Sequence, residues 1–424
     1  MKNYLFFALV VVLFVSLLGV LGCTKLESED GLTHIEVWTI ALKPKFTSCM
    51  EGLFAKFEED NPGIKIDWID LPQQNIVQML MASIAGGVAP DLVNLNASEA
   101  ISLAQRHSLA AISDLVTPEE EGEYFPNLWQ AANCEGKVYA FPWYVSTRVL
   151  IYNRDLLQKA GWPVDKPPQS RVEAVRLAEI VHRRSPNIYG FFPVVRLLDD
   201  WQMEELPVYD KRSGLALFAG KEQAELLGWY ADLYRREIIP KEVLIEGYTG
   251  ALERYKQGNL ALLEAGPQLL LQIKADAPEV YKVTDVAKLP WSSKGLLPAS
   301  LMNFVIPQSS KHKELAVKLG LFLTSWQNQL AFAKEVPLLT STIKSTEDKF
   351  FIQGRGEPLQ DKAIRISLQQ LPYARDFSLK LSHSKELERL INRGAEKAIY
   401  GEVEPLPALQ STALEWNEIV GNGR

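Results

Sequence analysis

After an apolar N-terminal run, the chain alternates between the hydrophobic periods of strands and helices. Apolar residues that run together or alternate predict strands, and apolar residues spaced three and four apart predict helices. The predicted strands cover 35–40, 64–71 and 91–95, and the predicted helices cover 46–60 and 74–85. Asn61-Pro62-Gly63 ends the first helix, and Gly86-Gly87 ends the second. The order β-α-β-α-β is typical of a mostly parallel sheet covered by helices on both faces.

Polar and aromatic residues lie at the carboxyl ends of two of these strands. Trp38 is near the end of the first strand, and Asn96 and Ser98 follow the third. Ligands of open α/β sheets bind beyond the carboxyl ends of the strands. We therefore expect these three side chains to face a ligand site.

The segment 136–161, GKVYAFPWYVSTRVLIYNRDLLQKAG, carries the strongest single signal in the chain. Two β-rich runs flank Pro142-Trp143-Tyr144, and Asn153 is predicted to cap a helix that begins near Leu156. Proline stiffens the backbone between the runs, and two large rings lie where a chain would otherwise turn in water. The arrangement predicts a crossing between two lobes that also presents rings to a ligand.

Three side chains of this segment are ligand candidates with different alternatives. Tyr144 is the first candidate, because its ring covers apolar C–H faces and its hydroxyl pairs with polar groups. Trp143 faces either the ligand or the core. Arg148 pairs either with ligand oxygens or with a neighbouring carboxylate. The sequence leaves the last two choices open.

The remaining patterns continue the mixture of strands and helices. A proline-rich loop at 161–170 precedes a helix that runs to Arg184, with Ser170 and Glu173 as its capping box. Further strands are predicted at 138–141, 149–152, 261–264 and 301–306, and further helices at 221–236, 248–257, 311–333 and over most of 361–420. No composition shift marks a linker, so we expect the chain to cross between its lobes more than once.

The N-terminus differs in kind from the rest of the chain. A nearly unbroken apolar run over residues 4–22 ends at Cys23, and Val20-Leu21-Gly22-Cys23 resembles the lipobox of bacterial lipoproteins. The resemblance implies a signal peptide over 1–22, lipidation of Cys23 and a tether over 23–31. An uncleaved anchor and an ordinary secretory peptide are the alternatives. Each of these places the body of the protein outside the cytoplasm, and the first attaches it to the membrane through the lipid.

Composition narrows the possible partners. The chain has 424 residues, of which 47% are hydrophobic, and its net charge of −7 comes with no basic stripe. A sizeable core is therefore expected, and a nucleic-acid partner is not. Cys49 and Cys134 remain beside Cys23, and they form either a disulfide or two separate thiols.

No motif in the chain points to catalysis, a metal or a cofactor. The five histidines lack HExxH spacing, and CxxC, Walker-type and GxSxG sequences are absent. We assign no catalytic residue, metal ligand or cofactor. A glycoside hydrolase needs only two carboxylates, which spacing in the sequence does not exclude. A secreted carbohydrate-active hydrolase and a structural surface lipoprotein are therefore the alternative functions.

Several segments, taken in order, resemble one family. They read FAKFEEDNPGIKIDW (54–68), MASIAGGVAPDLVNLN (81–96), the segment 136–161, YKQGNLALLEAGPQ (255–268), FVIPQSSKHKELAVKLGLFLTSWQNQ (304–329) and the element Pro337-Leu338-Leu339. The set is similar to the extracytoplasmic solute-binding proteins of carbohydrate ABC importers, in the maltose- and glycerol-phosphate-binding-like group. The resemblance covers most of the chain after residue 31.

This resemblance implies a two-lobed α/β periplasmic-binding-protein fold, in which each lobe is a mostly parallel sheet flanked by helices. Lobe 1 is expected at 32–142 and about 290–340, and lobe 2 at 143–289 and about 341–424. It also implies a monomer that closes on a carbohydrate and delivers it to the transmembrane subunits of an ABC permease. No nucleotide site is expected in this chain.

The second lobe supplies the remaining candidates. Trp201, Tyr248 and Trp291 are proposed as ring platforms, with packing in the core or on the surface as the alternative for each. Gly266 follows the strand 261–264, where it either admits a ligand to backbone N–H groups or makes a tight turn. The acidic pairs at 199–200 and 204–205 are interpreted as solvated charges, with contact of one of them with a ligand hydroxyl as the alternative. Residues 191–210 match the family poorly, so the identity of the sugar does not transfer.

Overall fold

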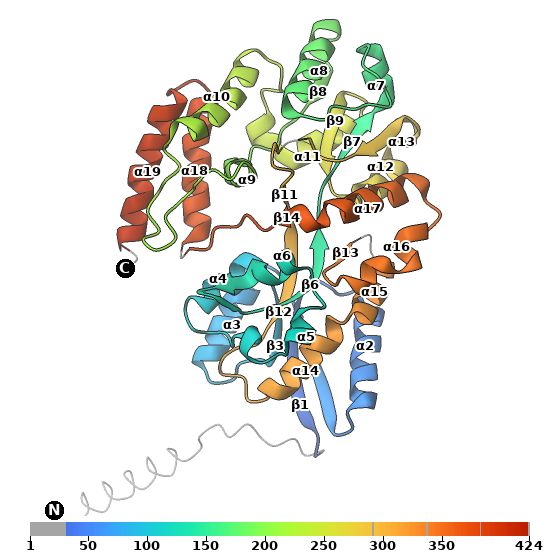
Figure 1. The fold of residues 1–424 in the computed structure, drawn as a ribbon, viewed down its shortest axis with the longest axis vertical. Helices are drawn as coiled ribbons and strands as arrows, with labels where there is room; N and C mark the ends of the chain where they lie inside the picture. The colour runs from blue at the N-terminus through green and yellow to red at the C-terminus, as the bar shows by residue number, and fades with distance from the viewer. Residues whose placement is uncertain (1–30, 291, 336–337, 382, 423–424) are drawn as a thin grey trace, which may run out of the picture.

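The computed structural model describes residues 31–422 apart from 291, 336–337 and 382. The predicted signal peptide, Cys23 and Trp291 lie outside the described residues. Figure 1 shows two lobes joined by extended segments, with the N-terminal strands in one lobe and the C-terminal helices in the other. Within the described ranges, no helix combines the length and the apolar character needed to cross a membrane.

Lobe 1 is built on a six-stranded sheet in the order β13-β6-β12-β3-β1-β2. The strands are β1 (Thr33–Ile40), β2 (Ile64–Leu71), β3 (Leu92–Asn96), β6 (Phe141–Ser146), β12 (Ser300–Val305) and β13 (Leu339–Thr340). Strand β1 is parallel to β2 and β3, whereas β12 is antiparallel to β3 and β6, and β13 is antiparallel to β6. The sheet is therefore mixed. Strands β1, β2, β3 and β6 run in one direction and β12 and β13 run against them, so most of the strands share one direction, as expected, although β6 has only antiparallel neighbours.

Helices cover both faces of this sheet. The main ones are α2 (Thr47–Asp60), α3 (Ile76–Ala85), α4 (Ala97–Ala104), α14 (Lys313–Leu323) and α15 (Trp326–Glu335). Shorter elements follow α4, namely η1 (Ile112–Asp114), α5 (Pro118–Glu121), α6 (Pro126–Trp129), η2 (Gln130–Ala132), β4 (Asn133–Cys134) and β5 (Lys137–Val138). At Gly320 of α14 an added Cβ would lie 2.6 Å from the ring of Phe141, so only glycine lets this helix pack so closely on β6.

The single helix predicted at 311–333 is wrong, because two helices occupy that range. Helix α14 ends at Leu323, and Ser325 Oγ accepts the backbone N–H of Asn328 in the first turn of α15 (3.4 Å). The side-chain amide of Asn328 donates to the carbonyl of Phe322 (2.7 Å), which satisfies the end of α14. Side-chain capping thus divides a continuous helical pattern.

Lobe 2 contains a four-stranded sheet in the order β10-β7-β9-β8. Its strands are β7 (Val149–Asn153), β8 (Tyr189–Phe191), β9 (Leu260–Ala265) and β10 (Thr284–Ala287). Among neighbouring strands only β8 and β9 are parallel, because β7 lies between β10 and β9 and runs against the other three strands. Helices α7 (Arg154–Lys159), α8 (Arg171–Arg184), α11 (Val243–Lys256), α12 (Leu269–Asp276), α13 (Pro278–Lys282) and α17 (Pro358–Gln370) surround it. Asn153 caps α7 by accepting the N–H of Leu156 (3.1 Å), as predicted.

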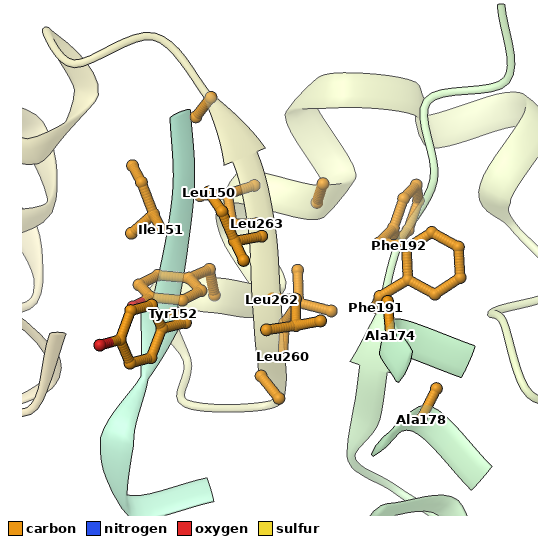
Figure 2. Close-up of a cluster of buried hydrophobic side chains, with 14 of the residues drawn as sticks. Leu150, Ile151, Tyr152, Ala174, Ala178, Phe191, Phe192, Leu260, Leu262 and Leu263 are labelled. Atoms are coloured by element: carbon orange, nitrogen blue, oxygen red, sulfur yellow. The ribbon is translucent and has the colours of Figure 1, made fainter. Parts of the chain in front are cut away.

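The core of this sheet is apolar and tightly packed. Figure 2 shows β9 between the side chains of β7 on one side and Phe191, Phe192 and the small residues of α8 on the other, and all of them belong to one buried cluster. At Gly190 an added Cβ would lie 2.1 Å from the Cα of Ala178. Glycine at this position therefore lets α8 lie directly against β8.

A second core in lobe 2 is purely helical. It joins α9 (Leu197–Met203), α10 (Lys221–Arg235), α18 (Ser384–Ile399) and α19 (Pro405–Asn422), which gather at one side of the lobe in Figure 1. Trp201, Phe218 and Trp416 are almost completely buried in it. Lobe 2 is thus a sheet body beside a helical body.

The crossing between the sheets is shorter than predicted. Residues 143–146 belong to β6 in the lobe 1 sheet, so the boundary at 142/143 is wrong and only Thr147 and Arg148 separate β6 from β7. Pro142 lies inside the strand, opposite Asn303, where the β6–β12 register shifts. Such a bulge accommodates a residue that lacks a backbone N–H.

A two-stranded ribbon lies beside this crossing. It pairs β11 (Leu297–Pro298) with β14 (Ala374–Arg375). The remaining elements before β14 are η3 (Lys344–Glu347), α16 (Lys349–Gln353) and η4 (Leu371–Tyr373). The chain therefore passes between the lobes at several places, as expected.

Candidate functional site

A cavity of about 560 Å³ lies beside the crossing, between the two bodies of lobe 2. Strand ends and the crossing form one side of it, and α9, α18 and the segment after β14 form the other. Its lining residues are Ser146, Thr147, Arg148, Val195–Asp199, Tyr248, Gly266, Gln268, Pro298–Ser300, Phe377, Ser378, Glu388 and Asn392.

Arg148 is held at the floor of the cavity by Glu264. Its Nη1 lies 2.6 Å from Glu264 Oε1, and the two side chains are only 20% and 16% exposed. Burial opposes the charge of Arg148, but the neighbouring Glu264 outweighs it and raises the pKa of the guanidinium. Arg148 thus lines the cavity and also neutralises the carboxylate of Glu264. Pairing with a carboxylate and a position at the ligand site, which the sequence left open as alternatives, are therefore compatible.

Asp199 projects from the first turn of α9 and lines the same cavity. Burial raises the pKa of its carboxyl to about 7, Arg148 opposes this shift and Asp200 adds to it. The nearest cation in ion-pair range is Arg196, at 3.8 Å and 45% exposed. This carboxyl therefore changes its charge near neutral pH.

Asp200 next to it has a different role. Its Oδ1 pairs with Arg171 Nη2 at 2.8 Å, and its Oδ2 accepts the hydroxyl of Tyr230 at 2.7 Å. Burial raises the pKa of the Asp200 carboxyl, and Arg171 opposes the shift. The interpretation of residues 199–200 as solvated charges is wrong for both residues, because α9 packs between the sheet and the helical body. Asp200 fixes α9, and α9 presents Asp199.

Tyr248 and Gly266 meet at the sheet side of the cavity. Tyr248 follows a break in α11 at Gly247, whose φ of 51° and ψ of −138° suit glycine alone. Burial raises the pKa of the Tyr248 hydroxyl, whereas Arg148 and a backbone hydrogen bond with Gly266 lower it. At Gly266 an added Cβ would lie 2.3 Å from Gln268 Oε1, so a side chain here would displace another lining residue.

Three of the residues proposed from the sequence therefore line the cavity, namely Arg148, Tyr248 and Gly266. Two of the tryptophans do not. Trp201 is fully buried in the helical core, where its indole donates to the carbonyl of Gln223 (3.3 Å). Trp38 is 4% exposed in lobe 1, and its indole donates to Glu36 Oε1 (2.7 Å). Both rings fill core space, which corrects their proposed roles.

The other candidates from lobe 1 also serve its own structure. Tyr144 packs against Trp143 and Phe332, with ring centroids 4.8 and 5.6 Å away. Burial raises the pKa of its hydroxyl to about 12. Asn96 Oδ1 caps α4 by accepting the N–H of Glu99 (2.9 Å) and the hydroxyl of Ser98 (2.8 Å). None of these candidates lines the cavity, and Trp143 adopts the core alternative.

Sequence reasoning missed most of the polar side chains that line the cavity. Glu388 and Asn392 lie four residues apart on α18, and Gln268 follows the strand β9. The spacing of Glu388 and Asn392 on a strongly amphipathic helix is the signal that places them on one face. Nothing in the local sequence indicates which surface that face meets.

The segment after β14 ties lobe 2 to lobe 1. Gln105 Nε2 donates to the carbonyl of Lys380 (2.8 Å), and Lys380 Nζ donates to the carbonyl of Ala131 (3.1 Å). Asn127 donates to the carbonyl of Ala374 (2.8 Å). These bonds hold one wall of the cavity in place across the lobes.

The described ranges contain neither a disulfide nor a cluster suited to a metal. Cys49 and Cys134 are free thiols, and burial raises the pKa of each. No group of three or more His, Cys, Asp or Glu side chains in the described part of the chain is placed to hold a metal ion.

Comparison with known proteins agrees with this architecture. Residues 43–330 match the family described as bacterial extracellular solute-binding protein. A Synechococcus protein provisionally named an oligosaccharide periplasmic-binding protein superposes with a TM-score of 0.81 and 28% identity, covering 92% of this chain and 99% of its own. The sugar-binding protein MalE from Xanthomonas citri superposes with a TM-score of 0.77 at 22% identity, covering 92% and 98%. An uncharacterised lipoprotein of Streptomyces antibioticus is 24% identical over 385 residues, 85% of this chain and 82% of that protein.

Proposed function

We propose a carbohydrate-capturing role for this chain, which belongs to the bacterial extracellular solute-binding protein family. The chain is a solute-binding protein of the kind that serves sugar ABC importers. In our proposal it binds a sugar or sugar-polyol in the cavity beside the crossing and delivers it to the transmembrane subunits of an import permease. The protein acts as a monomer and performs no catalysis.

The chemistry of the cavity is the observation that supports this proposal. Two carboxylates, two guanidinium groups and two side-chain amides surround it, together with the rings of Tyr248 and Phe377. Hydroxyl groups of a sugar both donate and accept, so they pair with each of these polar groups. The rings offer apolar surface to the C–H faces of the sugar. A volume of about 560 Å³ is in the range of ligand pockets.

Closure of the lobes completes the site in this proposal. Lobe 2 and the crossing supply most of the lining, and the lobe 1 sheet supplies only Ser146 and Ser300, so in this proposal lobe 1 adds further contacts when it approaches. Asn96 and Ser98, which are partly exposed at the start of α4, are the proposed lobe 1 contacts. A ligand that touches both lobes favours the closed state, because only that state makes all of its contacts.

A ligand screen tests the function. Thermal unfolding of the protein without residues 1–22 is measured with mono-, di- and oligosaccharides and with sugar–glycerol compounds. A true ligand raises the melting temperature in proportion to ln(1 + [L]/Kd). Arg148→Ala removes a polar group from the floor of the cavity and is expected to abolish most of that rise. A shift that Arg148→Ala leaves unchanged contradicts this site.

The alternative functions give different results in the same assay. A carbohydrate-active hydrolase releases smaller sugars during prolonged incubation with oligosaccharides, which chromatography detects. A structural lipoprotein shows no ligand-dependent shift at all. Binding without turnover supports the importer role.

Attachment to the membrane is a separate part of the proposal. We assign Cys23 as the lipidated residue, residues 23–31 as the tether, and the outer side of the cell membrane or the periplasm as the location. Mass spectrometry of the membrane-bound protein should find a mature chain that begins at an acylated Cys23, with residues 1–22 removed. A membrane-bound chain that still carries residues 1–22 contradicts lipidation as the anchor.

A further inference from the structure

Several oxygen atoms at the cavity lack partners among the described residues. Thr147 is 2% exposed, lines the cavity, and its Oγ1 has no hydrogen-bond partner. Gln268 Oε1 is also buried and has no partner. A buried polar atom without a partner is costly and is uncommon in folded proteins. These two atoms indicate that the cavity is prepared to receive hydrogen-bond donors.

The carboxylates of the cavity outnumber the cations that remain to neutralise them. Arg148 is already bound to Glu264 at 2.6 Å. Arg196 is half exposed and lies 3.8 Å from Asp199, beyond hydrogen-bonding distance. Glu388 lines the same cavity on α18, and no lysine or histidine lines it. The cavity thus holds two carboxylates and, besides Arg148, one guanidinium, Arg196, that is ion-paired with Asp199 but forms no hydrogen bond with it.

We propose that the ligand of this cavity is a sugar or polyol that carries a basic amino group, recognised by Asp199 and Glu388 with Thr147 completing its hydrogen bonds. The inference rests on the proposed function and adds the chemical class of the ligand. An ammonium group brings three donors and no acceptor, whereas a hydroxyl brings one donor and two acceptors. An ammonium therefore suits the two carboxylates and the acceptor-only oxygen of Gln268 better than a hydroxyl does, whereas the Thr147 hydroxyl can accept from either. Its bonds to carboxylates are also charge-assisted, which makes them stronger than neutral ones.

The same arrangement disfavours a phosphorylated ligand. A phosphate group would meet Asp199 and Glu388 at the wall, and the cation best placed to bind it is occupied by Glu264. Like charges in a poorly solvated site repel strongly. A polyol phosphate should therefore bind more weakly than the corresponding free polyol.

The charged surroundings of the two carboxyls set a dependence on pH. The groups that face Asp199 or Glu388 are Arg148, Arg196, Asp200, Tyr248, Glu264, Asp376 and Lys385. Burial raises the pKa of both carboxyls, to about 7 for Asp199, and Asp376 adds to each shift. Deprotonated carboxylates bind an ammonium, so the affinity for an amino sugar should rise as Asp199 loses its proton and fall again once the amino group of the ligand loses its own.

Matched sugars test the proposal. Oligomers of β-1,4-linked glucosamine, N-acetylglucosamine and glucose share a backbone and differ at one substituent, and the monosaccharides glucosamine and galactosamine are compared with glucose and galactose. Calorimetry at pH 7.5 should show the amino member of a set binding at least about tenfold tighter than its neutral counterpart. Asp199→Asn or Glu388→Gln should reduce affinity for the amino member about tenfold more than for the hydroxyl member. Asp276→Asn, which changes an exposed carboxylate outside the cavity, should leave the preference unchanged.

The binding results distinguish a failure of the amino-sugar inference from a failure of the proposed function. Equal binding of the amino and neutral members, or tighter binding of sn-glycerol 3-phosphate than of glycerol, overturns the inference and leaves the proposed function standing. Binding to no carbohydrate overturns the proposed function and the inference together. A preference that survives in both cavity variants overturns the assignment to Asp199 and Glu388, and the melting curves of the variants show whether each is folded.

Discussion

The two lobes bury different kinds of side chains near the crossing that joins them. In lobe 1, Trp143 and Phe304 are buried on adjacent strands, and the asparagine beyond β3 caps a helix. In lobe 2, ionisable side chains are buried beside a cavity, including Arg148, Asp199 and Glu264. A strand end lines a ligand cavity only where another packed unit stands beside the sheet and leaves a space between them. Lobe 2 has that second unit in its helical core, whereas the lobe 1 sheet contributes only Ser146 and Ser300 to the cavity lining.

The largest expected effect is on the free energy of unfolding, when an aromatic ring is removed from the core of lobe 1. Trp143→Ala removes a ring that packs against three other rings in lobe 1, at centroid distances of 4.7–4.8 Å. The free energy of unfolding should fall by about 3–5 kcal/mol, because the space left behind closes only partly. Urea denaturation followed by fluorescence measures the loss.

Ligand binding provides the control for this variant. At a temperature where Trp143→Ala is folded, its affinity for the ligand should stay within about twofold of the unchanged protein, since an effect outside the site is mainly on stability. A large loss of affinity would show that the packing of lobe 1 and the cavity of lobe 2 are coupled.

The next effect concerns Asp199 and its pH dependence. The pKa of this carboxyl is raised from 3.8 to about 7 in the folded protein, mainly by burial. A raised pKa means that the protonated carboxyl stabilises the fold below pH 4 and that this contribution is lost as the pH rises through 7. Asp199→Asn should therefore melt close to the unchanged protein at pH 4 and several degrees higher at pH 8.

Asp232→Asn is the matched control for this experiment. Its carboxylate forms exposed ion pairs with Arg235 and Arg236, which lower its pKa. An exposed pair contributes about 0–1 kcal/mol, so this variant should gain no stability at pH 8. A gain that does not depend on pH in Asp199→Asn would mean that its carboxyl does not titrate as described.

In both lobes the sequence predicts the elements that local spacing decides, and it does not predict those that side-chain capping or distant packing decides. Periodicity predicts β2 and the start of α10 at the observed residues, because each is decided by local spacing. The split between α14 and α15 was missed, since it depends on side chains that cap backbone groups. The residues of the cavity divide in the same way, into those that the local pattern locates and those that distant packing brings in. Arg148, Tyr248 and Gly266 lie at strand or helix ends that the pattern locates, whereas Asp199 and Glu388 reach the cavity only through the packing of helices far apart in sequence.

A smaller effect is expected from the buried hydrogen bond that holds α9. Tyr230→Phe removes the hydroxyl that donates to Asp200 at 2.7 Å and leaves the ring in place. The free energy of unfolding should fall by about 1–3 kcal/mol, because a buried acceptor loses its donor. Urea denaturation of Tyr400→Phe, whose ring is 40% exposed, is the control and should show a change within about 0.5 kcal/mol.

The smallest effect compares one tyrosine from each lobe in ligand binding. Tyr248 lines the cavity, whereas Tyr144 packs against Phe332 away from it. Tyr248→Phe removes a hydroxyl beside Gly266 and Arg148 and should weaken binding by about fivefold to tenfold, the value of one hydrogen bond. Tyr144→Phe should leave affinity unchanged, and calorimetry on both variants under identical conditions measures the contrast. The opposite result would place the ligand against lobe 1, where the position of Tyr144 beside the crossing first suggested it.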